Sequence, residues 1–141
     1  ALGLPLYAFS SLELSALPAS CLGKNILSAI DAKMKEVYFA YYDQAIKEII
    51  PPAIMKPEEL CQLHLDDFIL CGSATEMLSP LLQKAGYNFH NLNPIMKIPS
   101  AAGLFFLPEM LPEKYVPQDI ENLEPMYLRE AQAQVKKKKE N

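Results

Sequence analysis

Paired carboxylates are the first residues in this sequence whose types and spacing could do chemistry. Asp31 and Glu36 stand on either side of a short polar connection, and two neighbouring carboxyl groups can act as a general acid and a general base. Lys33 and Lys35 lie between them, however, and nearby positive charges keep carboxylates ionised. We therefore interpret Asp31 and Glu36 as parts of a turn stabilised by charge pairing, and we predict no catalytic residue there.

A glycine turn offers a second kind of chemistry, the binding of a phosphate. The sequence Gly72-Ser73-Ala74-Thr75 precedes a predicted helix, so backbone amides and the helix dipole could converge on an anion. Close approach of a phosphate to the backbone needs glycine, and the Cβ of Ala74 would obstruct it. We expect a plain tight turn and no cofactor-binding residue.

The histidines and cysteines do not form the pattern of a metal site. His64 and His90 are 26 positions apart, far from the helical or turn spacing of a metal-binding pair. Cys21, Cys61 and Cys71 are isolated, which is typical of small buried residues in a reducing compartment. We predict no metal ligand, no cysteine nucleophile and a cytoplasmic protein.

A hairpin should position the acidic pair. Its second arm is rich in aromatic residues and has apolar side chains on both faces, so the strand needs cover on both sides. We expect Phe39 or Tyr41 to be buried against the strand predicted at 67–71. The three strands of an antiparallel meander are expected at 26–30, 37–42 and 44–50, the last ended by Pro51 and Pro52.

Further along the chain, short helices alternate with short strands. The continuous apolar run at 67–71 is typical of a buried parallel strand, and a second short strand is expected at 87–90. Helices are predicted at 57–64, from a capping box of Ser73 and Glu76 to Gly86, and at 101–107 after Ser100.

Composition indicates an ordinary soluble domain. The 141 residues are 50% hydrophobic and 21% charged, and no apolar run is long enough to span a membrane. Residues 1–135 carry 9 basic and 16 acidic side chains, a net charge of −7, and the remaining lysines are at 136–139. So acidic a body is a poor binder of nucleic acid by itself. We interpret 136–141 as a disordered, solvated tail.

Two blocks carry a resemblance to a known family. DAKMKEVY at 31–38, followed at a matching distance by EPMYLR at 124–129, resembles the TsaB (YeaZ) family of bacterial tRNA threonylcarbamoyladenosine biosynthesis proteins. The family-signature residues, interpreted as structural, are Asp31, Ala32, Glu36, Val37, Tyr38, Gly72, Pro125, Tyr127, Leu128 and Arg129. Arg129 is the chain's single arginine. It could be functional, but we favour a role in pinning the C-terminal segment across the sheet through a carboxylate.

The resemblance also implies a fold and a domain division. The implied fold is α/β with an RNase H-like core, as in actin-like ATPases, of which this chain would hold mainly the C-terminal subdomain. Residues 1–20 would then end an N-terminal subdomain, with a strand at 4–9 and a helix opening at Ser10, and residues 21–135 would form the C-terminal subdomain. We expect the chain to be the C-terminal part of a longer protein, and its first segment to need cover from its own domain or from a second polypeptide.

The function that the resemblance implies is that of a scaffold without catalytic activity. The full-length protein would form a homodimer and bind the catalytic subunit TsaD. With the ATPase TsaE, it would support transfer of threonylcarbamoyl to the adenosine next to the tRNA anticodon, meeting tRNA only through the complex. Because the surface for TsaD would lie largely in the preceding half, we expect residues 1–141 alone not to bind it tightly. A glycoprotease-like peptidase and a nucleotide-binding actin-like module remain as alternatives.

Overall fold

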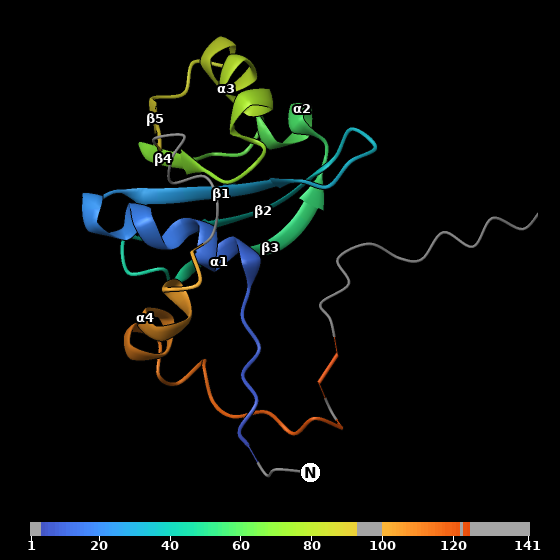
Figure 1. Cartoon of the computed structure of the whole chain (residues 1–141). Coiled ribbons are helices and arrows are strands. Elements are labelled where there is room, and N and C mark those ends of the chain that lie inside the picture. The colour runs from blue at the N-terminus through green and yellow to red at the C-terminus, as the bar shows by residue number, and fades with distance from the viewer. Residues whose placement is uncertain (1–3, 93–99, 122, 125–141) are drawn as a thin grey trace, which may run out of the picture.

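A five-stranded mixed sheet forms the centre of the protein. The computed structural model describes residues 4–92, 100–121 and 123–124, and in them the strand order is β3-β2-β1-β4-β5. The strands are Asn25–Asp31 (β1), Val37–Tyr42 (β2), Glu48–Met55 (β3), Phe68–Cys71 (β4) and Phe89–Asn91 (β5). The helices are Ser11–Ala16 (α1), Pro57–Leu60 (α2), Thr75–Lys84 (α3) and Gly103–Met110 (α4), with a 3-10 helix at Leu17–Leu22 (η1). Figure 1 shows α2 and α3 on one face and α1 and α4 on the other.

The predicted meander is confirmed, but the limits of its third strand were wrong. β1 and β2 pair antiparallel with Asp31 opposite Val37, and β3 pairs antiparallel with β2. Instead of ending at Pro51 and Pro52, β3 runs through both. The prolines are tolerated because β3 is an edge strand, where an amide can be missing without breaking the sheet. The register also shifts beside them, between the pairings of Phe39 and Tyr41.

The other half of the sheet is parallel, as the apolar run at 67–71 predicts. β4 pairs with β1 on one side and with β5 on the other, both in parallel, and all four residues of β4 are buried. The capping box predicted for the next helix was wrong. Helix α3 begins at Thr75 without a side-chain cap, and the hydroxyl of Ser73 instead accepts a hydrogen bond from the backbone N–H of Asp31.

Two separate apolar clusters lie on the two faces of the sheet. The cluster under α2 and α3, called here the α3 face, includes Phe39 and Tyr41, so their predicted burial against β4 is confirmed. The cluster under α1 and α4, called the α1 face, includes Ala40 and Tyr42 from the same strand. Strand β2 is thus covered on both sides, as its sequence requires.

The N-terminal segment does not form the predicted strand. Among residues 4–9, only Leu6 makes a β-bridge, to Gln118 near the other end of the described chain, and the Gln118 N–H donates to the Leu6 carbonyl over 2.7 Å. The segment therefore bridges to its own chain at Leu6, but residues 4–8 stay exposed, so the expected cover is not found among the described residues. Other limits also differ: α2 ends at Leu60 rather than at 64, β5 lies at Phe89–Asn91 rather than 87–90, and α4 extends to Met110.

Candidate functional site

The hairpin connection between β1 and β2 holds a strained, ion-paired turn. Lys33, Met34 and Lys35 all have positive φ angles, of 63°, 52° and 64°, a conformation that costs L-residues free energy. Asp31 accepts the Lys33 backbone N–H at Oδ1 and pairs with Lys33 Nζ at Oδ2, both over 2.8 Å. The hydrogen bond from the Lys33 side chain lowers the pKa of Asp31. A carboxylate held ionised in this way stabilises the turn and is poorly suited to act as a general acid.

The glycine turn after β4 docks directly on the end of β1. Gly72 has φ +93°, and a Cβ at this position would lie 2.2 Å from the carbonyl oxygen of Ala29. The Ala74 N–H donates to that oxygen over 3.0 Å, and the Thr75 N–H donates to Gly72 O over 3.3 Å. These two amides therefore form hydrogen bonds within the protein and do not point at a free anion site. The turn at 72–75 is a tight structural connection that needs glycine.

The structure thus brings part of the predicted signature together. Asp31, at the end of β1, and Ser73, beside Gly72, are joined by a hydrogen bond across 42 positions of sequence. The Ala32 N–H donates to Glu36 O and closes the hairpin into Val37 and Tyr38. The remaining signature residues lie outside the described part of the chain: Pro125, Tyr127, Leu128 and Arg129.

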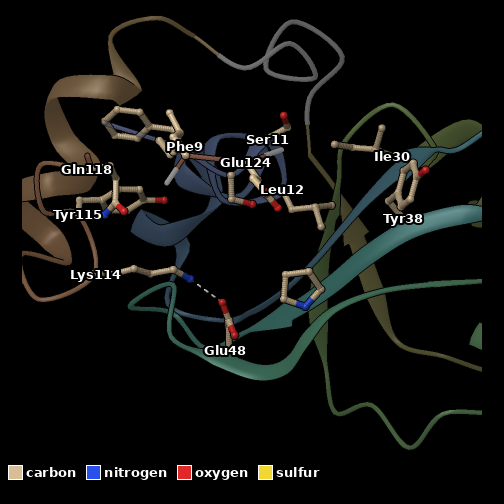
Figure 2. A pocket seen from close by; sticks show the side chains of 14 residues that line it. Phe9, Ser11, Leu12, Ile30, Tyr38, Glu48, Lys114, Tyr115, Gln118 and Glu124 are labelled. Atoms are coloured by element: carbon tan, nitrogen blue, oxygen red, sulfur yellow. Dashed lines mark hydrogen bonds and ion pairs between the residues drawn. The ribbon is translucent and has the colours of Figure 1, made fainter. Parts of the chain in front are cut away.

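A hollow lies elsewhere, on the α1 face. It has a volume of about 1060 Å³ and opens between the N-terminal segment, the edge formed by β2 and β3, and the segment at 114–124 (Figure 2). Its lining is mostly apolar, with acidic groups and a single lysine at one side. The lining residues include Phe9, Leu12, Tyr38, Glu48, Lys114 and Glu124. Nothing in the sequence alone predicted this pocket, because its walls come from both ends of the chain.

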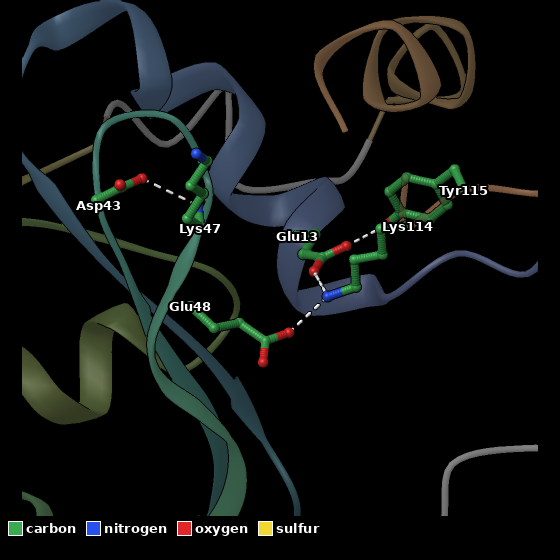
Figure 3. A network of polar contacts seen from close by, with 6 residues as sticks. All are labelled: Glu13, Asp43, Lys47, Glu48, Lys114 and Tyr115. Carbon is green, nitrogen blue, oxygen red and sulfur yellow. Dashed lines mark hydrogen bonds and ion pairs between the residues drawn. The ribbon is translucent and has the colours of Figure 1, made fainter. Parts of the chain in front are cut away.

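A buried carboxylate lies beside the pocket. Glu13 is 0% exposed and accepts hydrogen bonds from Lys114 Nζ and from the Tyr115 hydroxyl (Figure 3). Lys114 Nζ also pairs with Glu48 Oε1 over 2.5 Å. Burial lowers the pKa of Lys114, but the hydrogen bonds to Glu13 and Glu48 outweigh it, so that the pKa is raised. Burial, and then the hydrogen bond to Glu13, raise the pKa of Tyr115.

Sequence reasoning missed this network, although one signal was present. Glu13 stands between Leu12 and Leu14 in a short apolar helix, and a charged residue on the inward face of a helix needs a partner. The partner could not be identified, since Lys114 is 101 positions away.

The hydroxyl of Tyr42 is a buried polar group that is affected by the charges of Glu13 and Glu48. Tyr42 is fully buried, and among the described residues its hydroxyl has no partner at hydrogen-bonding geometry, although the Ser10 side chain is near enough to offset part of the rise in the Tyr42 pKa. Burial, followed by the charges of Glu13 and Glu48, raises its pKa. A neutral hydroxyl without a partner is a local cost to stability and not a sign of catalysis.

The cysteines and histidines do not form a shared site among the described residues. Cys71 is buried, which raises its pKa to about 12, whereas Cys21 is exposed and Cys61 is half-buried. Both histidines, His64 and His90, are exposed. Within residues 4–92, 100–121 and 123–124, no group of three or more histidine, cysteine or acidic side chains could hold a metal ion. In the same residues, no helix is long and apolar enough to cross a membrane.

Comparison with known proteins identifies the fold. No protein-family model matches the chain, and no curated protein matches it. Among solved structures, the chain is similar to an uncharacterized protein with similarity to peptidase YeaZ, from Pseudomonas aeruginosa, with a TM-score of 0.67 and 23% sequence identity. The match covers 89% of this chain and 59% of that one, so the chain spans little more than half the length of this neighbour. The chain therefore shares the α/β fold of this YeaZ-like neighbour, as the resemblance implied.

Proposed function

We propose that this chain belongs to a scaffold and activating subunit, without catalytic activity of its own, of the complex that makes threonylcarbamoyladenosine in tRNA. The subunit would act in the cytoplasm as a homodimer and bind the catalytic subunit TsaD and the ATPase TsaE. It would meet tRNA only within that complex. The proposal concerns the whole protein, because the chain spans only 59% of the length of the similar structure.

One observation carries the proposal. The hairpin at 31–38, whose sequence resembles the TsaB family, is docked on the Gly72 turn within a YeaZ-like fold. The motif rests on residue types, and the fold rests on the arrangement of the backbone. Their agreement supports the family and, through it, the role in tRNA modification.

A peptidase is the first alternative, because the similar structure is described by its likeness to a peptidase. A peptidase needs a nucleophile activated by a base, or a water activated by a metal. In the described part of the chain, neither histidine forms a hydrogen bond with a hydroxyl or a thiol, and Cys71 is buried with a raised pKa. The geometry of these residues favours the scaffold.

Depletion of the gene that encodes this chain tests the proposal directly. We expect threonylcarbamoyladenosine to fall in total tRNA, measured by mass spectrometry of digested nucleosides, and to return when the wild-type gene is restored. Pseudouridine in the same digest is the control, because a general loss of tRNA would change both. An unchanged level of threonylcarbamoyladenosine would overturn the proposal.

A thermal-shift measurement separates the scaffold from a nucleotide-binding module. A ligand present at 100 times its dissociation constant stabilises a folded protein by about 2.7 kcal/mol. We expect ATP with magnesium to leave the unfolding temperature of the chain unchanged, and a clear rise would favour the nucleotide-binding module instead.

A further inference from the structure

The connection between β1 and β2 concentrates backbone strain at one exposed point. Lys33, Met34 and Lys35, called here the hairpin tip, are three of the four non-glycine residues at positive φ in the described chain. Each such conformation costs an L-residue free energy, whereas glycine adopts it readily. The chain therefore carries a cost at this turn that a glycine-containing turn would avoid.

The fourth residue of this kind shows how the fold can offset such a cost. Ile46, in the turn between β2 and β3, has φ 61°, and its side chain is 1% exposed in the apolar cluster of the α1 face. Burial of an isoleucine side chain is favourable and helps to hold that turn. At the hairpin tip all three side chains are exposed, that of Met34 at 74%, so burial offsets little of the cost.

The hairpin tip is held in place from its base. The Ala32 N–H donates to Glu36 O over 3.0 Å, and the Glu36 N–H donates to Lys33 O over 3.1 Å. At the end of β1, the Asp31 N–H donates to Ser73 Oγ over 3.1 Å. Figure 1 shows the connection between β1 and β2 projecting beyond the end of the sheet. The strained residues are thus presented to solvent in a fixed conformation.

The side chains of the hairpin tip suit contact with another protein. Strained backbone concentrates at sites that bind other molecules, and methionine is a flexible apolar side chain enriched in protein interfaces. The two lysines are balanced by Asp31 and Glu36, so the formal charge of residues 31–36 is zero. Phosphate binding needs an excess of positive charge, and this balance therefore favours a protein over a nucleic acid.

We propose that the hairpin tip is a preorganised contact site for another protein, with Met34 entering an apolar recess of the partner and Lys35 meeting a carboxylate at its edge. A conformation that is fixed before binding lowers the entropic cost of association. The free chain loses some stability to the strained turn, and the complex gains affinity from it. The inference rests on the function proposed above only for its first probe, the catalytic subunit TsaD.

Glycine substitution separates the contact from the stability of the chain. Met34→Gly removes the side chain and relieves the strain, so the full-length protein should unfold a few degrees higher and yet bind TsaD from the same genome about tenfold more weakly. Met34→Ala keeps the strained backbone, so it should weaken binding without raising the unfolding temperature. Ile120→Ala is the matched control, because Ile120 is 75% exposed, and it should leave the affinity unchanged.

A photo-cross-linking residue tests the contact independently of the proposed function. We expect p-benzoylphenylalanine at position 34 of the full-length protein, irradiated in living cells, to form an adduct with one protein that mass spectrometry identifies. The same residue at position 120 should not form this adduct. Adding Lys35→Gly, which relaxes the turn, should reduce the adduct at position 34.

The two experiments distinguish failure of this inference from failure of the proposed function. If the wild type binds TsaD and Met34→Gly binds it as tightly, or if Met34→Gly unfolds at a lower temperature, the inference is overturned. If the wild type does not bind TsaD, the proposed function fails and the cross-link decides the inference. An identified protein adduct that Lys35→Gly reduces would support the contact site, whereas no protein adduct, or an adduct with RNA, would overturn it.

Discussion

The two faces of the central sheet are completed by different parts of the chain. On the α3 face, the covering residues all come from the stretch that follows β3, and the packing is apolar and aromatic. Phe68 stacks on Phe89 at a centroid distance of 5.7 Å and meets the edge of Tyr41 at 6.2 Å. On the α1 face, the cover comes from both ends of the described chain, where Glu13 meets Lys114 and Tyr115 beside the pocket.

This difference shows where stability and variable function are expected to reside. A face covered by neighbouring sequence is closed as soon as its local elements form, and its apolar contacts need no particular polar partner. A face covered by distant segments depends on a few specific polar contacts and leaves room for an occupant. We therefore expect substitutions on the α3 face to unfold the domain and those on the α1 face mainly to alter local contacts.

The largest effect is expected from Phe39→Ala on the α3 face. Phe39 is fully buried between β1 and β3, and truncating a buried phenylalanine costs about 3 to 5 kcal/mol. Chemical denaturation should show this loss in the free energy of unfolding. Phe105→Ala on α4 is the matched control, because Phe105 is 78% exposed and should change stability little. Equal losses in the two variants would show that Phe39 does not form part of a core.

Gly72→Ala, in the turn that packs against Ala29 of β1, should have the next largest effect. The left-handed backbone costs an alanine about 1 to 2 kcal/mol, and overlap of the new Cβ with Ala29 O adds about 1 to 3 kcal/mol. Gly86→Ala separates these terms, because Gly86 has φ +85° but no atom within 4 Å of the new Cβ. If the two variants unfold at the same denaturant concentration, the close approach of the turn to β1 is not important for stability.

Local patterns predicted much of the fold from the sequence. Alternation and the apolar run at 67–71 were sufficient for the meander and for a buried parallel β4, because both signals lie within a few residues. The limit of β3 was wrong, since the rule that proline ends a strand fails on an edge strand with a shifted register.

The α1 face could not be predicted in the same way. The pairing of Glu13 with Lys114 and the bridge of Leu6 to Gln118 join residues more than 100 positions apart, and no spacing rule links them. The pocket between them is a product of these long-range contacts. Of the candidate site, the sequence indicated only the hairpin turn and the need for glycine at 72.

Lys114→Met tests whether the α1 face depends on its polar contacts. Removing one partner of a buried ion pair costs about 3 to 5 kcal/mol, but the Lys114 side chain is 45% exposed, so we expect about 1 to 2 kcal/mol. Lys24→Met is the control, because both partners of its pair with Asp67 are partly exposed, at 33% and 42%, whereas Glu13 is 0% exposed, so the loss should be less than about 1 kcal/mol.

The Lys114→Met effect should also depend on pH. The folded-state pKa of Lys114 is raised, so its contribution to stability is complete below the unfolded value of about 10.4 and is lost as the pH rises through the folded value. The difference between wild type and Lys114→Met should therefore be constant near neutral pH and narrow under alkaline conditions. A difference that widens there would contradict the assigned pairing.

Tyr42→Phe should have the smallest effect and the opposite sign. The Tyr42 hydroxyl is buried without a partner among the described residues, and removing such a group while keeping the ring should stabilise the chain by about 1 kcal/mol.

Burial raises the pKa of Tyr42, so the folded state resists ionisation of this hydroxyl. The wild type therefore loses stability as the pH rises above the unfolded tyrosine value of about 10, and the variant does not lose this contribution. The advantage of Tyr42→Phe in the free energy of unfolding should thus grow at alkaline pH. A variant less stable than wild type at neutral pH would mean that the Tyr42 hydroxyl has a hydrogen-bond partner. The α1 face would then contain no buried polar group known to lack one among the described residues.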